Sequence, residues 1–101
     1  MEFNIAIEPG TENTAYGVVV PDLPGCFSAG DTLDEAMDNA REAIALWFES
    51  VIKDGKEIPV AKTLAEHQIN PDFAGWIWAV VEVPVERYFD STEKLKNPNG
   101  V

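Results

Sequence analysis

The sequence predicts an α+β fold, in which an antiparallel sheet of three to four strands carries one long amphipathic helix packed on a face. Three observations predict this class. Short apolar runs separated by Pro, Gly and Asn fill residues 3–29, as they do in hairpins. A long apolar stripe with helical spacing follows, and a last apolar run comes near residue 80. The predicted order is β-β-β-α-(α)-β, in which the helix can cover the sheet.

One domain accounts for the chain of 101 residues. Domains of this length bury roughly 65% of the surface that their unfolded chains expose. Hydrophobic residues make up 46% of the sequence, enough for a core. We place the domain at residues 1–89 and expect a polar, frayed tail at residues 90–101, where Asn, Pro and Gly gather.

The first strands form a hairpin. Phe3, Ile5 and Ile7 alternate with Asn, Ala and Glu, which is the period of a strand with one buried face. Turn-forming residues fill 9–14, and residues 15–20 supply the returning strand. We therefore expect a hairpin closed by a loop of about six residues.

The segment from Tyr16 to Ala36, YGVVVPDLPGCFSAGDTLDEA, is the most informative part of the chain. Two prolines and a glycine in Pro21–Gly25 end the second strand. Residues 26–29 predict a short third strand. Thr32 and Glu35 then have the spacing of a capping box, which marks the start of a helix.

A helix of about 22 residues follows this box. Acidic residues fill its first turns and Lys53 its last, the order that the helix dipole favours. Gly55 is the expected C-terminal stop. The apolar stripe consists of Leu33, Ala36, Met37, Ala40, Ile44, Trp47, Phe48, Val51 and Ile52.

The last third of the chain contains a short helix and a strand. Thr63–Glu66 repeats the capping-box spacing, and Asn70-Pro71 ends that helix. Residues 76–83 are apolar on both faces up to Glu82, which predicts a central or paired strand. Residues 85–89 fit either a strand end or one helical turn.

The charge is strongly negative, with eighteen acidic residues against seven Lys and Arg and a formal net charge of −11. Such a charge repels phosphate backbones and attracts basic proteins. No apolar stretch reaches the roughly 18–20 residues of a membrane span, and the first residues lack a signal-peptide pattern. The single cysteine, Cys26, fits a reducing compartment. We expect a cytoplasmic protein.

Few residues could carry catalysis. Cys26 and His67 are the single cysteine and histidine and lie far apart in the chain, so we expect a packed Cys26 and a His67 on the helix surface or in the C-terminal turn of its helix. Asp38 and Glu42 share a helix face and could hold magnesium, but a solvated acidic face is the simpler interpretation. No glycine-rich phosphate loop occurs. The sequence therefore predicts no enzyme, no cofactor and no metal site.

Several segments resemble HicB-type antitoxins: residues 16–36, the Ala-rich amphipathic helix, Glu57-Ile58-Pro59 and Trp76–Ala79. The resemblance covers residues 3–88 and implies a partial ribonuclease H-like domain without catalytic acids. It also implies a partner, a HicA toxin, which is a small basic messenger-RNA-cleaving protein whose catalytic histidine the antitoxin covers.

The resemblance implies a protein that binds and occludes its toxin. Relatives continue past a segment like Thr92–Leu95 into a DNA-binding domain, whereas six residues follow Leu95 here. Direct DNA binding by this chain is therefore not expected, and the oligomeric state stays open between a homodimer and a higher oligomer. The alternatives are an autorepressor whose DNA-binding segment is missing and a degenerate, non-catalytic nuclease-like domain.

A toxin-contact face is expected around the turn and the start of the helix. Its carboxylates would steer a basic toxin, and Leu23 and Phe27 would form an apolar centre. The alternative is that these acids only cap the helix and keep the protein in solution. The candidate contact residues are Asp22, Leu23, Phe27, Asp31, Asp34, Glu35, Asp38 and Glu42.

Overall fold

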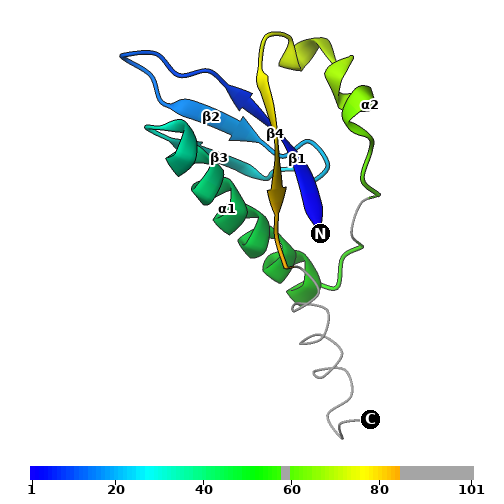
Figure 1. Cartoon of the computed structure of the whole chain (residues 1–101). Helices are drawn as coiled ribbons and strands as arrows, with labels where there is room; N and C mark the ends of the chain where they lie inside the picture. The colour runs from blue at the N-terminus through cyan, green and yellow to red at the C-terminus, as the bar shows by residue number, and fades with distance from the viewer. Residues whose placement is uncertain (58–59, 85–101) are drawn as a thin grey trace, which may run out of the picture.

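The computed structural model describes residues 1–57 and 60–84 (Figure 1). Within them the predicted α+β class and the order β-β-β-α-(α)-β are confirmed, and a 3-10 turn, η1, is added. The elements are β1 (Glu2–Glu8), β2 (Tyr16–Val19), β3 (Phe27–Gly30), α1 (Leu33–Lys53), α2 (Leu64–Gln68), η1 (Pro71–Phe73) and β4 (Ile77–Glu82). The predictions made for Ile58-Pro59, for residues 85–89 and for the tail at 90–101 lie outside the described residues.

The four strands form one antiparallel sheet in the order β3-β2-β1-β4. β1 lies between β2 and β4, with Ala6 opposite both Val19 and Trp78. β4 pairs with β1 alone among the described strands. β4 is therefore an edge strand. The sequence predicted either a central or a paired strand, and the paired strand is correct.

The two helices contact opposite faces of the sheet and lie well apart in Figure 1. Phe48 of α1 contacts Phe3, with ring centroids 5.6 Å apart. Trp78 stacks on His67 of α2 and meets Phe73 of η1 edge-on. Trp78 lies opposite Ala6 of β1. Phe3 and Ala6 are an odd number of positions apart along β1, so their side chains point to opposite faces of the sheet.

The main core lies between α1 and the sheet. α1 presents Ala36, Ala40, Ile44 and Phe48 at intervals of four residues, all of them fully buried. Small residues in its first half let the helix approach closely, since a Cβ on Gly30 would lie 2.4 Å from the Ala36 nitrogen. The buried cluster comprises Phe3, Ile5, Ile7, Val18, Val20, Leu23, Cys26, Ala36, Ala40, Ile44, Phe48, Val81 and Val83.

Both ends of α1 are fixed by the residues that the sequence indicated. The Thr32 hydroxyl accepts a hydrogen bond from the Glu35 N–H at 3.1 Å, which is one half of the expected capping box. Gly55 has a φ of +69°, and the Lys56 N–H bonds the Val51 carbonyl at 3.0 Å. This is a Schellman motif, so Gly55 is confirmed as the stop.

Two members of the predicted apolar stripe are less buried than their spacing suggested. Leu33 is 38% exposed, and Trp47 packs at the margin of the core. The Trp47 indole N–H donates to the Pro24 carbonyl at 2.9 Å, which ties α1 to the turn after β2. The apolar stripe is wider than the part of α1 that faces the flat sheet, so residues at the margins of the stripe stay partly exposed.

Candidate functional site

The structure separates the eight candidate contact residues into two groups. Asp22 and Leu23 are buried, with exposed fractions of 7% and 2%, so their side chains offer a partner little surface in this fold. Phe27 is 65% exposed at the start of β3. The remaining five are exposed and gather at the N-terminal half of α1: Asp31, Asp34, Glu35, Asp38 and Glu42.

Three of these acids form a row along α1. Asp34, Asp38 and Glu42 follow each other at intervals of four residues, so they lie on one face of the helix. Arg41 pairs with Asp38 at 2.7 Å and offsets part of the charge. The row is a solvated anionic surface on a rigid, capped helix.

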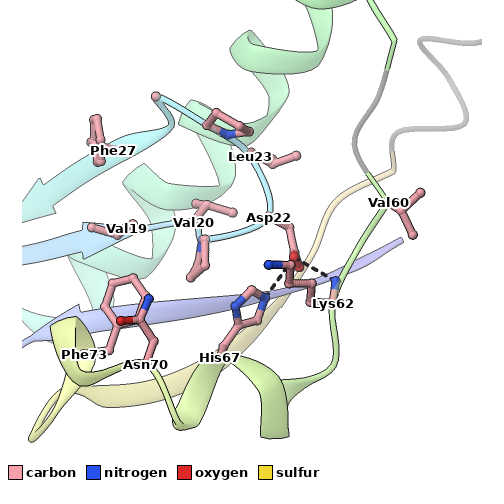
Figure 2. A pocket seen from close by; sticks show the side chains of 13 residues that line it. Val19, Val20, Asp22, Leu23, Phe27, Val60, Lys62, His67, Asn70 and Phe73 are labelled. Carbon is pink, nitrogen blue, oxygen red and sulfur yellow. Dashed lines mark hydrogen bonds and ion pairs between the residues drawn. The ribbon is translucent and has the colours of Figure 1, made fainter.

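Asp22 has a structural role that the sequence did not reveal. Its carboxylate accepts a hydrogen bond from the Lys62 N–H at 2.9 Å and bonds the His67 Nε2 at 2.8 Å (Figure 2). Of the two positions expected for His67, the C-terminal turn is correct, because His67 lies in the last turn of α2. The helix surface is wrong, because the residue is 6% exposed. Since the His67 ring also stacks on Trp78, with centroids 6.1 Å apart, this pair connects the turn after β2, the last turn of α2 and β4.

A groove of about 460 Å³ lies between the Pro21–Gly25 turn and the α2–η1 segment. Figure 2 shows Phe27 and Phe73 on the same side of the view with Val19 between them, Val60 on the opposite side, and Asp22 and His67 between the turn and α2. Val19 and Val20 contribute apolar surface, and every buried side-chain N and O atom of the described residues has a hydrogen-bond partner. Such a groove suits an apolar side chain of a partner.

The single cysteine, Cys26, belongs to the buried core and does not line the groove. Cys26 is 3% exposed, and burial raises the pKa of its thiol to about 11, so it stays protonated at neutral pH and is a poor nucleophile. The expected packed role of Cys26 is thereby confirmed. In residues 1–57 and 60–84, no three His, Cys, Asp or Glu side chains gather as metal ligands. None of the described helices is both long and apolar enough to span a bilayer.

A family model described as HicB-like antitoxin of bacterial toxin–antitoxin systems matches residues 3–97. The chain belongs to this family. The resemblance carried by residues 16–36 is thereby confirmed, and the relatives include two HicB antitoxins of Photorhabdus laumondii.

Solved HicB structures share the fold. The crystal structure of the Burkholderia pseudomallei antitoxin HicB matches with a TM-score of 0.72 and 42% identity, over 82% of this chain and 63% of that chain. A chain of the HicA3 and HicB3 toxin–antitoxin complex matches with a TM-score of 0.70 and 30% identity, over 82% of this chain and 98% of that one. An uncharacterized 14.9 kDa protein of Haemophilus phage HP1 is 42% identical over 83 residues, 82% of this chain. The chain spans 62% of that relative's length.

The fold brings together Asp22 and His67, two residues that the sequence analysis considered separately. The Asp22–His67 pair joins residues 45 positions apart, and no local pattern connects them. A weak signal exists, since Asp22 is the one charged residue between Gly17 and Gly30. A charge inside an otherwise apolar stretch indicates a buried partner.

Proposed function

We propose that this protein is an antitoxin that binds a small basic HicA-like RNA-cleaving toxin and occludes its active site. Family membership supports the antitoxin role. The HicA3 and HicB3 complex supports the partner, because the matched chain of that complex is covered over 98% of its length. The observation that carries the proposal is the exposed acidic row on α1 in a chain with a net charge of −11.

The acidic row would act on the encounter with the toxin. A basic protein is attracted by carboxylates over about 8–10 Å at physiological salt, and the attraction raises the association rate. Asp34, Asp38 and Glu42 are the centre of this surface, with Asp31 and Glu35 beside them. Because exposed ion pairs contribute little to affinity, the row steers the toxin rather than holding it.

The holding contact needs an apolar anchor, and Phe27 supplies one. Phe27 lies opposite Val19 of β2, which lies opposite Ala6 of β1, which in turn lies opposite Trp78 of β4. Directly opposite residues point their side chains to the same face, so Phe27 shares the face of Trp78, which is the sheet face away from α1. Exposed aromatic residues at the rim of a groove are typical of binding hot spots. A toxin that touches both Phe27 and the acidic row wraps around the β3 edge.

Charge reversal tests the steering surface. We expect the variant Asp34→Lys, Asp38→Lys and Glu42→Lys to associate with the purified HicA-like toxin at least about tenfold more slowly at low salt. The difference should narrow as salt rises, because screening weakens the attraction. Stopped-flow or biosensor kinetics at two salt concentrations measures this effect.

The matched control reverses three exposed acids away from the row, Glu8, Glu12 and Glu57, and changes the net charge by the same amount. We expect the control to slow association much less than the α1 variant. Equal slowing by both variants would show that only the overall charge matters. Unchanged association of the α1 variant at low salt would refute this contact face.

A further inference from the structure

One segment of the chain covers part of the sheet face away from α1. It comprises residues 60–76, with α2 and η1, and we call it the strap (Figure 1). Ala6 of β1 lies on this face, opposite Trp78, and is fully buried. Because the Ala6 side chain points away from α1, the strap is the described part of the chain that shields it.

The strap is attached to the sheet through one carboxylate and one aromatic ring. Within the described residues, both hydrogen bonds that leave the strap end on Asp22, which accepts the Lys62 N–H at 2.9 Å and bonds the His67 Nε2 at 2.8 Å (Figure 2). The rings of His67 and Phe73 contact Trp78, with centroids 6.1 Å and 5.5 Å apart. Asp22 and Trp78 are therefore the main points that hold the segment down.

The strap buries little apolar surface of its own. His67 is the one buried residue of α2, and η1 has none. Its aliphatic side chains point outward, since Val60 is 91% exposed and Ile69 is 83% exposed. A helix of five residues is not stable alone in water, so α2 depends on its contacts with the sheet. Segments with so few buried apolar contacts open more readily than the core.

We propose that the strap opens locally while the core between α1 and the sheet stays folded, and that the Asp22–His67 bond is the latch that sets how often it opens. Opening separates His67 from both Asp22 and Trp78 and frees the Lys62 N–H. The Asp22 carboxylate stays with the turn after β2, whose neighbour Leu23 is buried in the core. The latch therefore joins a fixed part of the fold to a movable one.

Opening enlarges the apolar surface on this face of the sheet. With the strap closed, β3 and β2 contribute side chains to the groove, whereas the side chains of β1 and β4 in the same row lie beneath the strap. The row crosses all four strands and consists of Phe27, Val19, Ala6 and Trp78. An open strap makes this row continuous, so the latch controls how much apolar surface the protein presents. This proposal does not rest on toxin binding.

The full 101-residue chain contains two built-in reporters, because His67 is its single histidine and Cys26 its single cysteine. Both are buried, His67 at the strap and Cys26 in the main core. Diethyl pyrocarbonate reaches His67 once the strap opens, whereas N-ethylmaleimide reaches Cys26 once the core opens. Measured against short peptides around each residue, His67 should be protected at least about 100-fold less than Cys26. Low concentrations of urea should speed the His67 reaction little, because local opening exposes little surface.

Three variants separate the latch from the core. Asp22→Ala should speed the His67 reaction at least about tenfold, whereas Asp22→Asn retains an acceptor oxygen and should speed it far less. Ile44→Val trims a fully buried side chain of α1, so it should speed the Cys26 reaction at least about twofold and leave the His67 reaction unchanged. Equal protection of His67 and Cys26, an equal response of both to Ile44→Val, or a wild-type His67 rate in Asp22→Ala would each overturn the proposal.

Discussion

Replacing Phe48 with alanine should remove about 3–5 kcal/mol from the free energy of unfolding. Phe48 is fully buried, and its ring contacts Phe3 at 5.6 Å and Trp47 at 5.3 Å. The truncation leaves a cavity that the sheet on one side and α1 on the other cannot collapse to fill. Since small domains have about 5–15 kcal/mol of stability in total, the variant should be largely or partly unfolded at physiological temperature.

Two neighbours on the same helix serve as comparisons for Phe48→Ala. Leu46 is 59% exposed, and Leu46→Ala should change stability by less than about 0.5 kcal/mol. Trp47→Ala should fall between them, because it loses partial packing and the hydrogen bond to the Pro24 carbonyl. Urea unfolding followed by circular dichroism gives all three values. A Leu46→Ala variant as damaged as Phe48→Ala would show that the helix faces the sheet differently.

Asp22→Ala should destabilise the protein by about 2–5 kcal/mol. Truncation removes the partner of the buried His67 imidazole and of the part-buried Lys62 N–H, and a buried group left without its partner costs about 1–3 kcal/mol. Asp22→Asn should cost much less, because its amide oxygen sits where the carboxylate oxygen accepts both bonds. Chemical denaturation of both variants measures the difference.

A double-mutant cycle isolates the bond between the two side chains. His67→Ala in the wild type removes the partner of Asp22, whereas His67→Ala in the Asp22→Ala background removes a group already unpaired. We therefore expect the double variant to be more stable than the sum of the single losses predicts, by about 0.5–3 kcal/mol. Strict additivity would mean that the 2.8 Å contact contributes nothing to stability.

The parts of the fold that follow local rules could be predicted from the sequence. Alternation gave β1, the Pro21–Gly25 turn separated β2 from β3, and Thr32, Thr63 and Gly55 marked helix ends with geometry that the structure repeats. Each of these signals operates within a few residues, so a sequence contains all of the information that they need.

The parts that failed depend on contacts between distant segments. The burial of His67 was not predicted, because its partner, Asp22, lies 45 residues away. Trp47 was assigned to the core because helical spacing cannot tell the centre of an apolar stripe from its margin. β4 is apolar on both faces because α1 lies on one side and His67 and Phe73 on the other, a pattern that does not distinguish an edge strand from a central one.

The exposure of the candidate contact residues could be predicted only in part, because for some of them it depends on how distant segments pack. The acids after Gly30 follow a helix start that local rules locate, so their exposure and common face could be expected. Asp22 and Leu23 lie in the turn, where the side that faces the core depends on how α1 and α2 pack around it. The structure turns both of them inward.

Titration of RNA cleavage tests directly whether this chain neutralises a toxin by binding it. A purified HicA-like toxin at fixed concentration should cleave a reporter RNA progressively more slowly as the chain is added. We predict that cleavage falls to zero at a fixed molar ratio and that the acidic-row variant needs a higher concentration at early times. Undiminished cleavage in the presence of a large excess of the folded chain would contradict the account.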